Sequence, residues 1–196
     1  MPRRILALTL HPAPVSFNAA LIETYAEAAA AQGHELRLKA LHALQFDADF
    51  GQAGYAGAKP LEPDLEAFMA DLAWAEHLVL STPMWWGGLP AKAKGLFDRT
   101  FLPGRAFDPR QPRIFGLPKP LLTGKTARVF LTSDTPGIAF NWVYSAAMRK
   151  QIERQILGFV GIKPVRFSHF SPVEHSDAGK RQGWLAQARA LGRQAA

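Results

Sequence analysis

The chain of 196 residues contains no cysteine. Disulfide bonds, thiolate metal sites and cysteine nucleophiles are therefore excluded, and the composition fits a reducing compartment such as the cytoplasm, where we expect the protein. Long hydrophobic runs are also missing, because the apolar stretch before His11 is too short for a signal-peptide core or a membrane span. No metal site is expected either, since Asp47 and Asp49 lie in an irregular segment without further ligands.

Runs of one charge are absent as well, although the formal net charge is +7 and the sequence pI is about 10.0. Lys and Arg are scattered, and their only adjacent pairs are at residues 3–4, 149–150 and 180–181. No nucleic-acid recognition motif accompanies them, so we interpret the charge as a solvated basic surface that attracts anionic cofactors, and we expect no nucleic-acid partner. Because no low-complexity segment marks a boundary, residues 1–196 are predicted to form a single domain.

The sequence also lacks a glycine-rich phosphate loop, since neither a P-loop nor a dinucleotide fingerprint is present. Instead, residues 4–10 form a nearly continuous apolar run that is typical of a central strand covered on both faces. The run breaks at His11-Pro12, and Ser16 is a suitable N-cap for a helix that extends to Gln32. A helix start carrying Ser16 and Asn18 can bind a phosphate group, whereas the simpler alternative is an ordinary capped helix.

The predicted strands and helices alternate along the whole chain. Strands are predicted at residues 4–10, 34–41, 77–81, 127–131 and 164–170. Helices are predicted at residues 16–32, 63–75, 91–98 and 141–159, with an interruption at Gly158, and a last helix follows a cap at residues 175–177. Residues 42–61 and 100–125 are predicted to be irregular. This alternation predicts an α/β fold, a three-layer sandwich around a five-stranded parallel sheet with the flavodoxin-like order 2-1-3-4-5.

Residues 81–91 follow the third predicted strand and contain two adjacent tryptophans. Consecutive side chains of an extended segment face opposite ways, so Trp85 and Trp86 cannot both point into one core. At least one indole therefore faces a cavity or a partner, and an aromatic loop at a strand end suits a flat conjugated ring. Residues 132–137 place hydroxyl and backbone N–H groups after the fourth strand. The loops after the first, third and fourth strands are thus predicted to form one ligand site.

At these loops the sequence resembles the flavodoxin-like NAD(P)H:quinone oxidoreductases, the family of DT-diaphorase, the bacterial modulators of drug activity and the potassium-efflux ancillary proteins. The matching segments cover nearly the whole chain in order, and they are His11 with residues 16–18, the run Pro-Met-Trp-Trp-Gly-Gly-Leu-Pro-Ala at 83–91, and residues 94–99, 104–107 and 158–161.

The resemblance implies a non-covalent flavin, FMN or FAD, and NADH or NADPH as electron donor. The implied cofactor-binding residues are His11, Ser16, Phe17 and Asn18 at the phosphate, Pro83, Met84, Trp85, Trp86 and Gly87 at the isoalloxazine ring, and Thr132, Ser133, Asp134, Thr135 and Gly137 on its other side. Phe107, Trp142 and Tyr144 are the expected substrate-binding residues. Hydride passes to the flavin and then to a quinone in the same slot, which is a two-electron ping-pong cycle. The resemblance also implies a homodimer, in which residues 101–107 and the following proline-rich loop complete the neighbour's pocket.

The sequence departs from the family in two places. Mammalian members have a Thr-Thr-Gly-Gly run where residues 132–135 here are Thr-Ser-Asp-Thr, and no counterpart of their proton-handling Tyr and His is assigned, so no catalytic residue is named. The alternatives are an azo- or nitroreductase of the same fold, a regulatory subunit of a potassium-efflux membrane transporter, and a one-electron flavodoxin. Flavodoxins are typically acidic, whereas this chain is basic. A further alternative makes Trp85 and Trp86 simply core and dimer-contact residues.

Overall fold

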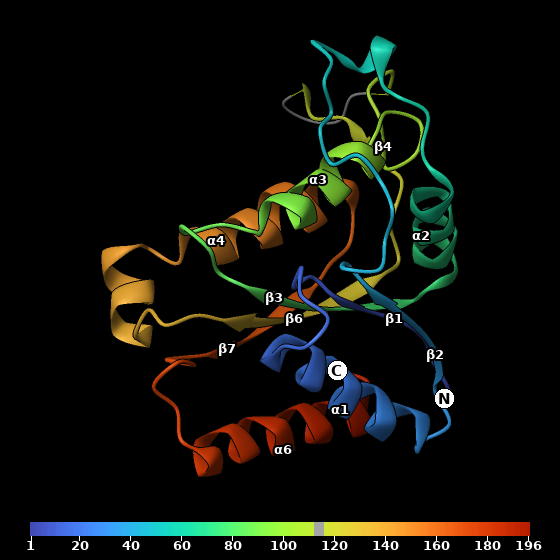
Figure 1. Ribbon diagram of the computed structural model, residues 1–196. Coiled ribbons are helices and arrows are strands. Elements are labelled where there is room, and N and C mark those ends of the chain that lie inside the picture. The colour runs from blue at the N-terminus through green and yellow to red at the C-terminus, as the bar shows by residue number, and fades with distance from the viewer. Residues whose placement is uncertain (112–115) are drawn as a thin grey trace.

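The computed structural model describes residues 1–111 and 116–196. Its central sheet has five parallel strands in the order β2 (Glu35–Ala40), β1 (Arg4–Thr9), β3 (His77–Pro83), β6 (Thr126–Thr132) and β7 (Val165–Phe170), as Figure 1 shows. The predicted order 2-1-3-4-5 is confirmed. The carboxyl ends of β3, β6 and β7 lie toward the left of Figure 1, and the loops that follow them meet at this edge.

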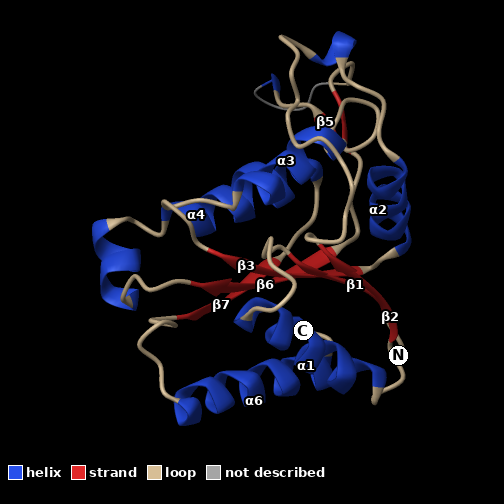
Figure 2. Ribbon diagram, viewed as in Figure 1, coloured by secondary structure: helices blue, strands red, loops and turns tan. Residues whose placement is uncertain are grey.

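Helices cover both faces of the sheet (Figure 2). On one face lie α1 (Phe17–Ala30) and α6 (Ala178–Gln194), and on the other lie α2 (Pro63–Trp74), α3 (Ala91–Thr100), α4 (Ala147–Lys150) and α5 (Gly158–Val160). In β1, Ile5 and Ala7 pack toward α1 and α6, whereas Leu6 and Leu8 belong to the core on the opposite face. Because both faces are buried, the strand reads as a continuous apolar run.

The predicted helix caps agree with the structure. The Ser16 hydroxyl accepts a hydrogen bond from the Ala19 amide at 3.1 Å and starts α1, and the Asp177 carboxylate accepts one from the Lys180 amide at 2.7 Å and starts α6. Each cap satisfies an amide that has no partner within its own helix. Gly161 ends the helical run before β7 with φ 102°, a left-handed conformation that glycine adopts without strain.

The helix predicted at residues 141–159 differs from the structure. A wide-turn helix, η3 (Ala139–Val143), ends at Ser145 and Ala146, which have φ 52° and 49°, and the helical run resumes through α4, η4 (Gln151–Leu157) and α5. No glycine or proline between residues 139 and 150 indicates this break. Gly158, the expected interruption, lies inside the helical run, where a Cβ atom would come within 2.5 Å of the Glu153 carbonyl.

Two irregular segments pack against α2 and α3. Residues 42–61 contain only a short turn, η1 (Tyr55–Gly57), and the 1 % exposed Arg99 anchors this segment through the Glu62 carboxylate at 2.9 Å and the Pro60 carbonyl at 3.0 Å. The connection after α3 contains a two-stranded antiparallel sheet that was not predicted, β4 (Phe107–Asp108) with β5 (Lys119–Pro120). Part of the proline-rich loop, residues 112–115, lies outside the described residues. Within residues 1–111 and 116–196, no helix is long and apolar enough to cross a membrane.

Candidate functional site

Two adjoining cavities open at the carboxyl edge of the sheet. The first, which we call the His11 cavity, has a volume of about 290 Å³ and is lined by His11, Val15, Ser16, Phe17, Asn18, Pro83, Met84, Trp85, Thr132, Ser133, Asp134 and Val173. The second, the Trp86 cavity, has about 640 Å³ and is lined by Met84, Trp86, Gly87, Asp134, Thr135, Phe140, Tyr144, Ala147 and Met148. Met84 and Asp134 line both, so the cavities are neighbours.

The start of α1 gives the His11 cavity hydrogen-bond donors. The first-turn amides of a helix lack acceptors within the helix, so those of Phe17 and Asn18 are suited to an anion. The Nδ1 atom of His11 accepts from the Ala13 amide at 3.0 Å, which leaves Nε2 to carry the proton of the neutral ring. The His11 ring stands edge-on to Trp85 with centroids 5.7 Å apart. Serine, imidazole and amide donors together suit a phosphate group.

The side chain of Asn18 bonds within the protein, whereas its main-chain amide stays available to an anion. Its side chain is buried, donates to the Ser81 hydroxyl at 2.9 Å and accepts from the Thr132 hydroxyl at 3.1 Å. It therefore ties α1 to β3 and β6 at the floor of the His11 cavity. Similarly, the ring of Phe17 packs on that of Trp184 in α6, with the ring centroids 5.7 Å apart. The main chain of Phe17 is therefore the part that can contact a ligand in the cavity.

Trp86 lies at the tip of a tight turn. The amide and carbonyl of Trp85 bond to those of Gly88 at 3.0 and 2.9 Å, and the two central residues, Trp86 and Gly87, have φ 49° and 76°. Two left-handed central residues define a type I′ turn, which glycine, asparagine and aspartate favour. The Trp86 side chain is fully exposed, and its backbone has a left-handed conformation that tryptophan rarely adopts. The expectation that at least one tryptophan faces a cavity is confirmed.

The loop after β6 is fixed by main-chain hydrogen bonds to both neighbours. The Met84 amide donates to the Thr132 carbonyl at 2.8 Å, and the Ser133 amide donates to the Phe170 carbonyl at 3.2 Å. The Asp134 carboxylate accepts from the Glu174 amide at 2.6 Å. The loop after β7, which sequence reasoning did not include in the site, therefore braces one wall of the His11 cavity.

His169 contacts one residue of each cavity, Ser133 and Phe140. Its Nε2 lies 2.8 Å from the Ser133 hydroxyl, and its ring lies 4.4 Å from that of Phe140, which lines the Trp86 cavity. Burial lowers the pKa of His169 below its ordinary value, so the imidazole is neutral at pH 7. Sequence reasoning missed His169 and Phe140, because the first is one residue of a strand and the second belongs to no motif.

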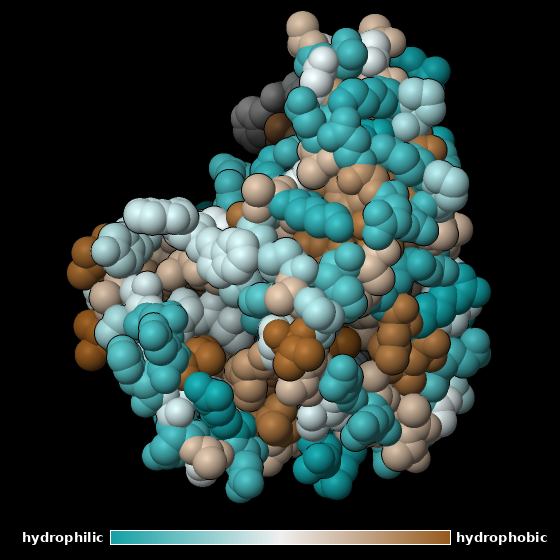
Figure 3. Space-filling model, in the orientation of Figure 1, coloured by the Kyte–Doolittle hydropathy of each residue, from teal (hydrophilic) through white to brown (hydrophobic). Residues whose placement is uncertain are grey.

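Of the predicted residues, Phe107, Gly137 and Trp142 line neither cavity. Trp142 is 83 % exposed and projects with Ile138, Val143 and Tyr144, which are also exposed. Figure 3 shows hydrophobic side chains gathered at the left edge of this face, where the segment after β6 projects in Figure 1. Of these four exposed residues, only Tyr144 lines the Trp86 cavity.

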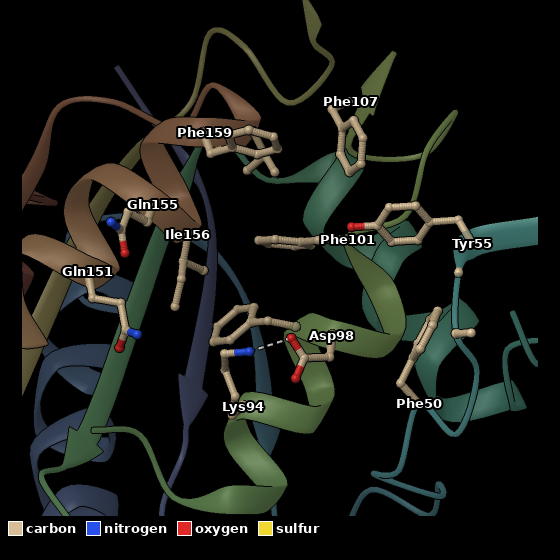
Figure 4. A pocket seen from close by; sticks show the side chains of 14 residues that line it. Phe50, Tyr55, Lys94, Asp98, Phe101, Phe107, Gln151, Gln155, Ile156 and Phe159 are labelled. Carbon is tan, nitrogen blue, oxygen red and sulfur yellow. Dashed lines mark hydrogen bonds and ion pairs between the residues drawn. The ribbon is translucent and has the colours of Figure 1, made fainter. Parts of the chain in front are cut away.

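Phe107 lies in a third, aromatic cavity of about 600 Å³ between α3 and the run from η4 to α5 (Figure 4). Its ring stands edge-on to Tyr55 at 5.9 Å and to Phe159 at 5.3 Å, and a Lys94 to Asp98 ion pair of 2.5 Å lies at the rim. None of the residues that line the aromatic cavity lines the Trp86 cavity. A groove of about 450 Å³ joins the two, because Gln151 and Gln155 line both it and the aromatic cavity, and Gly87 lines both it and the Trp86 cavity.

Comparison with known proteins identifies relatives of this chain. A family model described as a flavodoxin-like fold matches residues 3–191. The chain is 29 % identical over 124 residues to NAD(P)H dehydrogenase (quinone) 1 of Cavia porcellus, covering 54 % of this chain and 45 % of the relative. It is 34 % identical over 128 residues to FMN-dependent NADH:quinone oxidoreductase 3 of Pseudomonas aeruginosa, covering 64 % and 54 %. The chain thus spans about half the length of these curated relatives.

Two solved structures are covered over nearly their whole length. NAD(P)H:quinone oxidoreductase from Methanothermobacter marburgensis superposes with a TM-score of 0.82 at 25 % identity, covering 100 % of this chain and 98 % of that one. An FMN-dependent NADH-azoreductase of Bacillus anthracis, solved with FMN, superposes with a TM-score of 0.72 at 14 % identity, which is a likeness of fold alone.

Proposed function

The chain belongs to the family with the flavodoxin-like fold, and from this we propose that it is a flavin-dependent NAD(P)H oxidoreductase that reduces quinones. The observation that carries the proposal is the pair of adjoining cavities at the carboxyl edge, one lined by anion donors and the other by aromatic side chains. In a doubly wound sheet this edge is where ligands bind. The names of the relatives, which are quinone oxidoreductases, support the same activity.

The residues of both cavities fit FMN. The first-turn amides of α1, the Ser16 hydroxyl and the His11 imidazole would bind its phosphate, and Asn18 would position them by tying α1 to the sheet. Met84, Trp86 and Tyr144 would contact the ring system in the larger cavity. We propose FMN rather than FAD because the bacterial relatives are named for FMN and the His11 cavity is small.

A bound flavin supplies the redox chemistry, since it takes up two electrons from NAD(P)H and passes them to an acceptor. The protein's part is to bind and orient. The hydrogen bonds of the Met84 and Ser133 amides and of the Asp134 carboxylate hold the walls of both cavities rigid, so donor amides keep their positions as charge develops. Because the Trp86 cavity serves donor and acceptor in turn, the oxidised nicotinamide leaves before the quinone binds. Parallel double-reciprocal plots are therefore expected.

We also propose a homodimer in which a second copy completes the site. Phe107 and Phe159 lie in a separate cavity and do not reach Trp86 of the same chain. A partner lying along the groove would bring its aromatic cavity to the Trp86 cavity and cover the exposed Ile138 and Trp142. The cytoplasm, which holds NAD(P)H, is the compartment that we propose.

The test is the visible spectrum of the purified protein with FMN under anaerobic conditions. We expect bound FMN to bleach with NADPH or NADH and to recover when a quinone is added. The variant Ser16→Ala tests the phosphate contacts. It should weaken FMN binding without altering the spectrum of the FMN that remains bound. Failure to bind FMN would refute the proposal, and binding without reduction by either nicotinamide would favour a carrier or regulatory subunit.

A further inference from the structure

The groove beside the Trp86 cavity follows the helical run from α4 to η4. Three residues, Gly87, Ala147 and Met148, line both the groove and the Trp86 cavity, so the two spaces are continuous. The groove has a volume of about 450 Å³. A ligand that is longer than the Trp86 cavity can therefore extend into the groove.

The charged side chains that line the groove are both cationic. Its remaining lining residues are Lys150, Gln151, Arg154 and Gln155, and no Asp or Glu of the described residues lines it. Lys150 and Arg154 are exposed, and Figure 4 shows Gln151 and Gln155 on the same helical run. Ammonium, guanidinium and amide groups all donate hydrogen bonds, and the first two add positive charge, so the groove is suited to a phosphate group.

No acidic side chain balances the two cations. Within residues 1–111 and 116–196, no ion pair includes Lys150 or Arg154. The intervening Glu153 pairs with Arg149 at 3.8 Å. Lys150 and Arg154 lie four positions apart on one helical run, where like charges repel and lower helix stability slightly. Helix stability thus gives no reason for two cations here, whereas an anionic ligand in the groove does.

The electron donor of the proposed function is too long for the Trp86 cavity. A cavity of about 640 Å³ holds one ligand of drug size, so beside the flavin ring system it has room for the nicotinamide ring but not for the whole dinucleotide. NADH and NADPH both carry a pyrophosphate, and NADPH carries a 2′-phosphate as well. These groups must lie outside the Trp86 cavity, and the groove that continues from it has the matching charge.

We propose that Lys150 and Arg154 bind a phosphate group of the nicotinamide donor, which is the pyrophosphate of both donors or the 2′-phosphate of NADPH. The inference rests on the proposed function, because it places the nicotinamide ring in the Trp86 cavity. Lys150 Nζ and the Arg154 guanidinium would donate to phosphate oxygens, and the amides of Gln151 and Gln155 would donate to neighbouring oxygens of the dinucleotide. In the dimer proposed above the partner copy borders the groove, so the dinucleotide would lie between the two copies.

The test compares Lys150→Gln and Arg154→Gln with the unsubstituted protein, all loaded with FMN. Calorimetry with NADP⁺, and separately with NAD⁺, gives the affinity without any reaction. Steady-state kinetics with NADPH and NADH give KM and kcat. We expect each variant to bind about tenfold more weakly, which corresponds to one hydrogen bond to a charged group. The KM should rise by a similar factor while kcat stays the same, because a contact away from the reacting ring stabilises ground state and transition state equally.

Arg189→Gln is the matched control. It removes one positive charge from the exposed side of α6, on the opposite face of the sheet, and should change the affinity by less than about twofold. Lys150 and Arg154 are exposed and repel each other, so thermal unfolding of both variants should match that of the unsubstituted protein. Gel filtration of each variant shows whether its oligomeric state is unchanged.

Weaker binding of NADP⁺ alone would identify the 2′-phosphate as the bound group, and equal weakening with NAD⁺ would identify the pyrophosphate. Unchanged affinity in both variants would overturn the proposal. Equal weakening by Arg189→Gln would overturn it too, because overall charge would then explain the effect. Variants that elute as smaller species than the unsubstituted protein would also overturn it, since the cations would then bind the partner copy.

Failure of the proposed function is a different result and appears in the unsubstituted protein, as FMN that does not bind or that neither nicotinamide reduces. Failure of the groove to bind the nicotinamide donor appears only when the variants are compared with a protein whose FMN is reduced normally.

Discussion

Trp86 occupies a backbone conformation that glycine adopts more readily. With φ 49° its backbone is left-handed, and its indole is fully exposed, so neither local strain nor burial accounts for a tryptophan here. A left-handed non-glycine residue costs on the order of 1 kcal/mol. The cost is understandable if the indole contacts a ligand in the Trp86 cavity.

Trp86→Gly should therefore separate stability from binding. The free energy of unfolding is expected to stay the same or to rise by up to about 1 kcal/mol, because the turn loses its strain. The FMN dissociation constant should rise about tenfold, since the stacking surface is lost. Urea unfolding and FMN fluorescence quenching measure the two quantities. Trp86→Phe is the control that keeps an aromatic ring, and unchanged FMN affinity in Trp86→Gly would contradict a stacking role.

His77 makes stability depend on pH. Its pKa in the folded protein is about 3, below the ordinary 6.5, chiefly because of burial. The unfolded chain thus binds a proton more readily, so the stability that neutral His77 contributes is complete above about pH 6.5 and is lost as the pH falls toward 3. Between pH 7.5 and 4.5 the unsubstituted protein should lose about 2 to 3 kcal/mol more than His77→Gln. Urea unfolding of both proteins in phosphate-free buffer measures this difference, and equal losses would show that His77 does not titrate on unfolding.

At the scale of elements, α1 and α6 cover the same face of the sheet and come into close contact at Gly192. A Cβ atom at Gly192 of α6 would come within 2.3 Å of the Tyr25 carbonyl of α1, so only glycine allows this approach. Gly183 lies in the same helix, and a Cβ atom there would meet nothing within 4 Å. Substituting alanine at these two glycines should therefore change the stability of the protein in opposite directions.

Gly192→Ala should destabilise the protein by about 1 to 3 kcal/mol, because the helices are forced apart. Gly183→Ala should stabilise it by up to about 1 kcal/mol, because alanine is the better helix former and the position is open. Thermal unfolding of the two variants measures the effects side by side. The same sign of change in both variants would mean that the α1 to α6 contact is looser than the structure indicates.

At the scale of the whole molecule, the proposed site is divided between two separate cavities of one chain. Trp86 and Tyr144 line one, whereas Phe107 and Phe159 line the other, and a groove lined by Gln151 and Gln155 lies between them. In the two-fold dimer that we propose, the cavity of one chain would join that of its partner, so each site would draw on both copies.

Mixing two defective variants tests this arrangement. Trp86→Ala and Phe159→Ala should each lower quinone reductase activity, and a mixture refolded at equal amounts should recover about a quarter of the unsubstituted activity, because half of the dimers then contain one intact site of two. Each variant refolded alone is the control. Activity that merely averages those of the two variants would place Trp86 and Phe159 in the same chain's site or outside it.

Local patterns were enough for the elements and for much of the candidate site. The apolar run at residues 4–10, the Ser16 cap and the double tryptophan depend on neighbours within a few positions, so the strand order and the three loops were predictable. The turn at Trp86 was likewise indicated by the glycines that follow it.

Contacts between distant residues were decided by the tertiary structure alone. The sequence indicated Asn18 as a phosphate ligand but gave no sign that its side-chain amide bonds to Ser81 and Thr132, which lie 63 and 114 positions away. The contacts of His169 with Ser133 and of His77 with Thr126 also join segments that no local pattern relates, and no local pattern indicates that Phe107 lies apart from Trp86. Helix caps and strand periods are short-range interactions, whereas the position of a side chain at a sheet edge depends on which strands pack beside it.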